Sequence, residues 1–227
     1  MLIALPNMDK SFTCTLFLPM EGKLSFKSIK TKNQILEFFE KYFPDTIDLI
    51  PELCEEYQNN PTGKLATVYC DQWHYEDIAL IFGDAAHAIV PFFGQGMNAS
   101  FQDCTVMNSL LKRFESNWEK IFLEYSHFQV PNGHAIANMA LENYIEMRDS
   151  VNDPNYRKRR ELELNLEHKF PERFLPRYSM VSFHEIPYAK VYDRGKTQMN
   201  LMDSFLAGNT TKDQLYNKIK QKLDPIR

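Results

Sequence analysis

The sequence IALIFGDAAHAIVPFFGQGMNASFQD, residues 78–103, decides the fold of this chain. Its first five residues form a continuous apolar run closed by Gly83-Asp84, a pattern typical of a strand buried on both faces. The glycine-containing segment Gly94-Gln95-Gly96 then leads into a run that favours a helix from about residue 96. The stretch therefore predicts a buried strand, a tight turn and a helix in close succession.

The residue types in this stretch also suggest a chemistry. A carboxylate at the end of a sheet strand, here Asp84, is well placed to accept hydrogen bonds from sugar or ribitol hydroxyls. A helix beginning near Gly96 offers unpaired N–H groups and the positive end of its dipole, which together stabilise nearby negative charge. Gly94 and Gly96 let the backbone approach a flat ring because no Cβ intervenes.

A dinucleotide fingerprint has to be considered at the same place. Gly94, Gly96 and Ala99 fit the loose pattern GxGxxG/A. In that fingerprint the strand runs directly into the first glycine, whereas here the eleven residues 83–93 separate the strand end from Gly94. The context does not fit, so we expect no pyrophosphate-binding βαβ unit at this position.

Composition narrows the class of protein. The 227 residues carry 26 basic and 30 acidic side chains, a net charge of −4, so no basic excess points to nucleic acid. The four cysteines form no CxxC pair or disulfide framework, which favours a reducing, cytoplasmic setting. The sequence offers no signal peptide and no long apolar helix, so we expect a soluble protein without a membrane anchor. We expect no metal site either.

Periodicity and breakers predict the remaining elements. Strands are expected over residues 2–6, 12–19 and 65–70, with a hairpin turn at Asn7–Lys10 between the first two. Helices are expected over residues 32–43, 47–57 (broken by Pro51), 96–113, 117–127, 133–151, 156–169, 187–206 and 211–222. The first part of the chain is thus mixed, and everything after about residue 95 is helical.

The stretch from Gly83 through Pro91 to Asn98 resembles the second flavin motif of the class A flavoprotein monooxygenases. Within that family it is closest to the enzymes that hydroxylate L-kynurenine. Other segments of the chain agree with this resemblance, namely Ile3–Asn7, Lys10–Phe17, Asn143–Arg148 and Pro176–Val181. The similarity extends along most of the chain, to about residue 190.

The resemblance implies a function and a set of roles. It implies an FAD- and NADPH-dependent monooxygenase that uses dioxygen to convert L-kynurenine to 3-hydroxykynurenine in tryptophan degradation. Asp84 would bind the flavin ribitol, and the pyrimidine ring would lie against Gly96, Met97 and Asn98. The residues expected at the substrate are Asn143, Tyr178, Phe92 and Phe93, with Pro91 completing the wall. No side chain is expected to act as a catalytic acid, base or nucleophile.

The resemblance also implies an architecture. The fold would be α+β or α/β, part of a class A flavin monooxygenase. Residues 1–73 would belong to an antiparallel substrate-binding sheet domain, 74–114 to the last strand and helix of the FAD-binding domain, and 115–227 to a C-terminal helical region. Family members open with a strand, GxGxxG and a helix that hold the ADP part of FAD, and none of the eight glycines here builds that fingerprint. We therefore expect a C-terminal portion that by itself binds FAD weakly or not at all.

Alternatives remain at this point. The chain could be a non-catalytic fragment or binding module that kept the scaffold, or a related hydroxylase acting on another aromatic acid. Asn143 shares a helix face with Ile136, Met139 and Ala140, so it could also be a core amide bonded to backbone. Without the resemblance, the sequence around Tyr178 predicts an ordinary core tyrosine. His87 is expected to be a residue packed or capping near the turn.

Overall fold

The structure is a computed structural model that describes residues 1–150 and 153–226. The chain divides into two compact units, Met1–Leu65 and a second that begins at Ala66. Each unit is described by itself below. The expectation for the end of the helix at residues 133–151 falls partly outside the described residues.

The first unit opens with a two-stranded antiparallel hairpin of β1 (Leu2–Pro6) and β2 (Phe12–Leu16). Leu2 pairs with Leu16 and Pro6 with Phe12. The turn closes through a hydrogen bond from the Asn7 amide to the Ser11 carbonyl at 2.8 Å. Both predicted strands and the turn are confirmed, although the second strand ends at Leu16 and does not reach residue 19.

Helices complete the core of the first unit. α1 (Lys32–Tyr42) starts at a capping box between Thr31 and Gln34, as its sequence favours. The short η1 (Pro44–Thr46) and α2 (Leu53–Asn59) follow. The expected break at Pro51 is confirmed, and of the helix expected over residues 47–57 only the part after this proline is α-helical, as α2. The core consists of Ile29, Ile35, Phe38, Phe39, Leu53 and Cys54.

At the start of the second unit, two of the expected strands differ from the structure. Residues 65–70 are extended without a regular partner, although the Val68 amide donates to the Ala88 carbonyl at 2.8 Å. The apolar run 78–82 forms only the two-residue strand β4 (Ala79–Leu80), paired with β3 (His74–Tyr75). Ile78 is 69% exposed, so the expected burial on both faces is wrong for this chain. Among the described residues only β3 is available to pair with β4.

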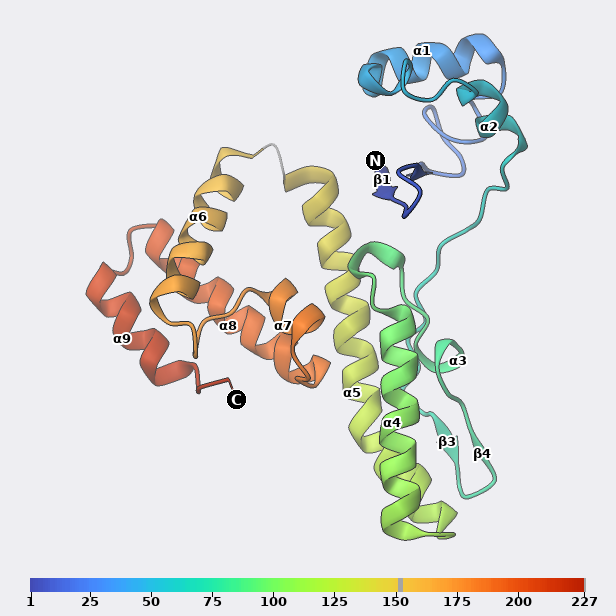
Figure 1. Cartoon of the computed structure of the whole chain (residues 1–227). Coiled ribbons are helices and arrows are strands. Elements are labelled where there is room, and N and C mark those ends of the chain that lie inside the picture. Colours follow the sequence, from blue (N-terminus) through green and yellow to red (C-terminus); the bar gives the residue numbers. More distant parts are fainter. Residues whose placement is uncertain (151–152, 227) are drawn as a thin grey trace. The chain divides into compact units, whose positions relative to one another are not determined.

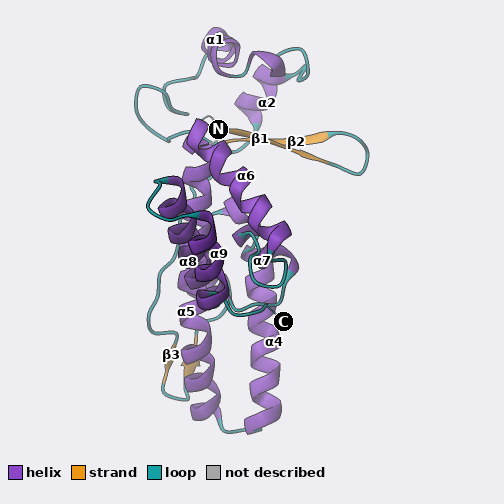
Figure 2. Ribbon diagram, turned by 90° about the vertical axis from the view of Figure 1, so that its left-hand side faces the viewer, coloured by secondary structure: helices purple, strands orange, loops and turns teal. Residues whose placement is uncertain are grey.

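Helices dominate the rest of the second unit (Figure 1). Long α4 and α5 lie side by side in both Figure 1 and Figure 2, and α8 packs against α5. The fold is thus mixed, with small antiparallel hairpins and many helices, as the coarse expectation had it. The helical elements are α3 (Asp84–His87), η2 (Pro91–Phe93), α4 (Gly96–Phe114), α5 (Trp118–Ile145), the π-type η3 (Glu146–Ser150), α6 (Pro154–Lys169), α7 (Arg177–Phe183), α8 (Tyr188–Leu206) and α9 (Lys212–Lys222).

Helix α5 corrects the expectation of two helices separated near residue 130. It runs without a break through Pro131, which is exposed on the outer face. Proline costs a helix about 3 kcal/mol, so continuous packing along the opposite face has to outweigh that cost. The residues of that face include Ile121, Tyr125, Gln129, Ile136, Met139 and Ala140. Helix α7 is an additional element that the sequence did not predict.

Two apolar clusters hold the helices of the second unit together. One joins η2, α5, α7 and α8 through Phe93, Ile136, Met139, Met180 and Val191. The other joins α6, α8 and α9 and includes Leu166, Phe174, Leu201, Leu215 and Ile219. No helix among the described residues is long and apolar enough to cross a bilayer.

Candidate functional site

Four aromatic rings gather where η2 meets the end of α5 and α7. Phe92 lies 4.5 Å from Tyr144 between ring centroids, and Phe93 stacks on Tyr178 at 5.7 Å with 27° between the planes. We call Phe92, Phe93, Tyr144 and Tyr178 the aromatic cluster. The Asn143 side-chain amide donates to the Phe92 carbonyl at 2.6 Å, which ties α5 to η2. The residues expected at the substrate therefore lie together, namely Phe92, Phe93, Asn143 and Tyr178.

The backbone between η2 and α4 has the conformation that its glycines permit. Pro91 begins η2, and Gly94 ends it at φ +67°, a left-handed value that favours glycine. No atom lies within 4 Å of the place where a Gly94 Cβ would stand, so the loop borders open space. The expected helix start at Gly96 is confirmed.

The N-terminus of α4 is exposed and carries no side-chain cap. Met97 is 70% exposed and Asn98 is also exposed. Within the described chain the N-cap residue Gln95 forms no capping hydrogen bond, and the first turn holds no acidic residue. The side chain of Gln95 is instead buried, where its Oε1 accepts from Tyr188 and from Asn98. The first-turn N–H groups can therefore face an external acceptor.

Asp84 is the first residue of α3 and is exposed. It follows Gly83, whose φ of +58° again lies in the left-handed region. A Cβ on Gly83 would stand 3.4 Å from the Ser100 Oγ, so the turn lies against the second turn of α4. The turn that precedes Asp84 therefore packs on α4, the helix whose first residues are Gly96, Met97 and Asn98.

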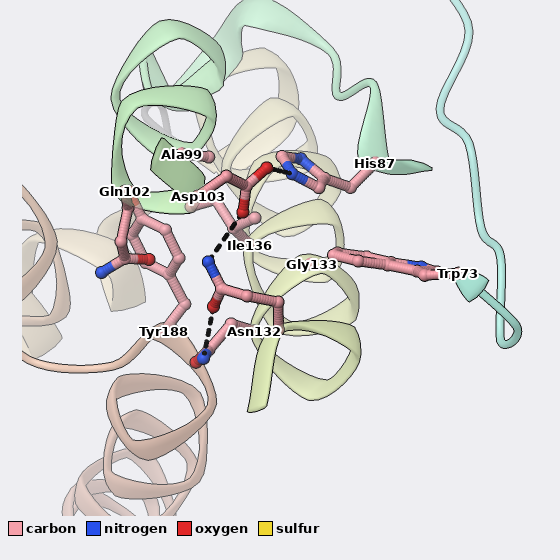
Figure 3. A pocket seen from close by; sticks show the side chains of 10 residues that line it. Trp73, His87, Ala99, Gln102, Asp103, Asn132, Gly133, Ile136 and Tyr188 are labelled. Carbon is pink, nitrogen blue, oxygen red and sulfur yellow. Dashed lines mark hydrogen bonds and ion pairs between the residues drawn. The ribbon is translucent and has the colours of Figure 1, made fainter. Parts of the chain in front are cut away.

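The buried carboxylate of Asp103 holds this turn in place, and Figure 3 shows its contact with His87. Asp103 of α4 is 1% exposed and accepts from the Gly83 amide at 3.1 Å and from the His87 Nε2 at 2.7 Å through Oδ2. Its Oδ1 accepts from the Gln129 side chain of α5 at 2.7 Å. Three donors compensate the desolvation of the charge. Asp103 therefore connects the α3 turn, α4 and α5.

The polar network continues from Asp103 toward α8. Gln129 accepts from the Asn132 side chain at 3.1 Å, and the Asn132 Oδ1 accepts from the Ala189 amide at 2.9 Å. His87 also stacks on Trp73 at 5.2 Å, so the expectation that it is a packed residue fits its surroundings. A cavity of about 10 Å³ lies among these side chains, room for about one water and not for a ring.

Burial shifts the pKa of two tyrosines beside this network. Burial, with a smaller contribution from Asp103, raises the pKa of Tyr188 to about 12. Burial likewise raises the pKa of Tyr125, again with Asp103 adding to the shift. Both phenols therefore stay neutral at physiological pH, and the Tyr188 hydroxyl donates to the Gln95 Oε1 at 3.1 Å. No three His, Cys, Asp or Glu side chains of the described residues come together as a metal site requires.

Several residues of this region were not singled out from the sequence. They include Asp103, Gln129 and Asn132 of the buried network and the ion pair between Arg177 and Glu142. Asp103 carried one usable signal, since a carboxylate in an otherwise buried helix face requires donors. The partners of Asp103 come from two other elements, so the sequence alone could not supply them.

Comparisons with known proteins agree with the motif. The family described as FAD binding domain matches residues 46–138. Three similar proteins are the kynurenine 3-monooxygenases of Flavobacterium johnsoniae (46% identical over 91% of this chain and 46% of that protein), Myxococcus xanthus (48%, over 86% and 42%) and Dictyostelium discoideum (43%, over 92% and 48%). The chain spans about half the length of these relatives. The predicted resemblance is confirmed.

Proposed function

We propose that this chain supplies part of the flavin and substrate site of an FAD- and NADPH-dependent monooxygenase that converts L-kynurenine to 3-hydroxykynurenine. One observation carries the proposal. The aromatic cluster includes residues of η2, which directly precedes the uncapped start of α4, and Gly83, the residue before Asp84, lies against the same helix. Relatives named kynurenine 3-monooxygenase support the choice of substrate.

The described residues fit a flavin. The exposed Asp84 carboxylate can accept hydrogen bonds from ribitol hydroxyls, and the first-turn N–H groups of α4 can donate to the pyrimidine edge of the ring. The open space beside Gly94 allows a flat ring to approach the backbone. FAD, once reduced by NADPH, would supply activated oxygen from dioxygen to an electron-rich aromatic ring.

The aromatic cluster would orient the substrate and keep water away from the reacting ring. Phe92 and Phe93 present apolar faces, and Tyr178 keeps 53% of its surface exposed beside them. Asn143 and Tyr178 would contact the polar amino-acid part of the substrate. Exclusion of water matters because water diverts activated oxygen from the substrate. No residue of this chain needs to act as an acid or base in this scheme.

We also propose the finer fold and location that the sequence indicates. Residues 1–73 would be part of a substrate-binding sheet domain, 74–114 of an FAD-binding domain and 115–227 a C-terminal helical region. The β3–β4 hairpin is short and leaves the apolar Ile78 exposed, which supports the proposal that these strands belong to a larger sheet of an FAD-binding domain. The cysteine pattern supports a cytoplasmic location.

A chimaera tests the activity. The 206 residues matched in the Flavobacterium johnsoniae relative would be replaced by the corresponding residues of this chain. We expect NADPH oxidation that depends on L-kynurenine and yields 3-hydroxykynurenine, with p-hydroxybenzoate inactive. Asp84→Ala in the chimaera should weaken FAD binding about 10–100-fold, since a charge-assisted hydrogen bond contributes about 1.5–3 kcal/mol.

The outcomes of this experiment separate the alternatives. A chimaera that binds FAD but hydroxylates only another aromatic acid would replace the substrate in our proposal. A folded chimaera without bound flavin would favour a non-catalytic scaffold. The unfused chain should show flavin absorbance well below one equivalent after purification, and a full equivalent would contradict that expectation.

A further inference from the structure

An ion pair is formed by the residues that directly precede two of the residues proposed to contact the substrate. Glu142 precedes Asn143 on α5, and Arg177 precedes Tyr178 at the start of α7. The Arg177 Nη1 pairs with the Glu142 Oε2, and its Nη2 lies 3.9 Å from the Glu146 Oε2. The pair therefore joins the two helices that carry Asn143 and Tyr178.

The pair is partly protected from solvent and shared by a third helix. The Arg177 side chain is 14% exposed and that of Glu142 is 38% exposed. The Tyr192 hydroxyl of α8 donates to the Glu142 Oε1 at 3.0 Å, so both carboxylate oxygens are bonded. Partial burial weakens the screening by salt, which makes such a pair stronger than an exposed one.

Two locally unfavourable residues are explained by this one contact. Arg177 is the first residue of α7, where the positive end of the helix dipole repels a cation. Gly195 lies inside α8, where glycine costs about 1 kcal/mol relative to alanine. A Cβ on Gly195 would stand 3.0 Å from the Arg177 Cδ, so the glycine makes room for the arginine. Residues that break local rules in this way are expected at functional sites.

Helix α7 is held by tertiary contacts, which include the buried Met180 and this ion pair at its first residue. It spans only seven residues, and within the described chain its N-cap residue Pro176 forms no side-chain cap. A helix so short is not stable without tertiary packing. Tyr178 lies one residue after Arg177, and its ring stacks on Phe93. The ion pair of Arg177 therefore acts on the first turn of α7, next to the residue that contacts Phe93.

We propose that Glu142 and Arg177 are positioning residues, which set the spacing between Asn143 and Tyr178 and thereby shape the site for an aromatic amino acid. The inference rests on the proposed function for its ligand and on the geometry for its mechanism. Neither residue needs to touch the substrate.

Charge exchange in the full chain tests the proposal. Glu142→Arg and Arg177→Glu are made singly and together, with Arg159→Glu, Asp203→Arg and their double variant as the matched control. The control pair also joins two helices, α6 and α8, at a distance of 2.7 Å, but it lies away from the aromatic cluster. NMR would follow the nuclear Overhauser contacts between the Phe93 and Tyr178 rings and the titration of each variant with L-kynurenine.

The two readouts give distinct expectations. Each single variant of the positioning pair should lose the Phe93–Tyr178 contacts and bind L-kynurenine about fivefold more weakly. The double variant should recover both in part, because the exchanged pair lacks the hydrogen bond from Tyr192. The control variants should leave both readouts unchanged. If a single variant does not fold, Arg177→Lys replaces it, since it keeps the charge but loses the planar fork. The Arg177→Lys variant should show a partial loss of the Phe93–Tyr178 ring contacts and of L-kynurenine binding.

Contrary results would be equally clear. Ring contacts that persist in both single variants, or a control pair with the same losses, would overturn the positioning role. Failure of the double variant to recover while it remains folded would also overturn it. If the unaltered chain, which supplies only part of the proposed site, does not bind L-kynurenine, the chimaera decides the substrate, and the ring contacts alone decide whether Glu142 and Arg177 position Tyr178.

Discussion

At the scale of single residues, Asp103 shows how a buried charge can organise a binding turn. Its two oxygens accept three hydrogen bonds, from the Gly83 backbone, His87 and Gln129. An uncompensated buried carboxylate would cost several kcal/mol, so the three donors fix one arrangement of their elements. This arrangement also fixes the backbone position of the exposed Asp84, because Asp84 directly follows Gly83, although Asp84 itself makes none of these hydrogen bonds.

Tyr188 gives a prediction on pH. Its pKa is about 12 in the folded chain and 10.0 as an ordinary value, so the unfolded chain loses the proton first as pH rises. The free energy of unfolding should therefore fall above pH 10, by up to about 1.4 kcal/mol per pH unit until about pH 12. Tyr188→Phe cannot lose a proton, but it lacks the hydrogen bond to Gln95 and should be about 1 kcal/mol less stable at pH 8.

Urea unfolding at pH 8 and pH 11 measures this difference. The stability gap between the unaltered chain and Tyr188→Phe should narrow or reverse at pH 11. Tyr42→Phe, at a 45% exposed position, is the comparison variant. A gap that is constant between the two pH values would contradict the linkage.

At the scale of elements, local sequence signals determine some helices and tertiary packing determines others. Helix α1 has its capping box and α4 its glycine start, so both were predictable near their true bounds. Helix α5 passes Pro131 and α7 lacks a cap, so local rules predicted a break in the first and missed the second. In both cases packing against neighbouring helices outweighs a local preference.

Gly133 in the middle of α5 gives a prediction at this scale. A Cβ there would stand 2.8 Å from the Trp73 ring and 3.1 Å from the His87 Cβ. Gly133→Ala gains helix propensity, but it forces Trp73 and His87 apart, and overpacking costs about 1–3 kcal/mol. We expect a net loss of stability in thermal unfolding, together with a changed Trp73 fluorescence.

Gly63→Ala provides the comparison for this variant. Gly63 lies outside helices and strands, and no atom stands within 4 Å of its Cβ position. Its substitution should change stability by less than about 0.5 kcal/mol. A Gly133→Ala variant that is more stable than the unaltered chain would show that α5 shifts without strain.

At the scale of the whole molecule, the two units have separate cores and predict separate unfolding. Both tryptophans, Trp73 and Trp118, belong to the second unit. Tryptophan fluorescence should therefore report the second unit alone, whereas far-ultraviolet circular dichroism reports both. We expect the two urea transitions not to coincide, because each unit has its own apolar cluster. Superimposable curves would indicate one cooperative unit.

The sequence by itself determined the resemblance, the hairpin, the helix that starts at Gly96 and the identity of the candidate flavin and substrate residues. Those features follow from short segments in which residue type, glycine position and spacing act locally. Tertiary structure decided that Phe92, Phe93, Asn143 and Tyr178 share one place, that Asp103 holds the Gly83 turn, and that Arg177 and Glu142 stand behind the cluster. These contacts join residues 20 to 93 positions apart, such as Gly83 with Asp103 and Gln95 with Tyr188. Only packing brings such residues together, because local propensity acts over a few neighbouring residues and carries no information on distant partners.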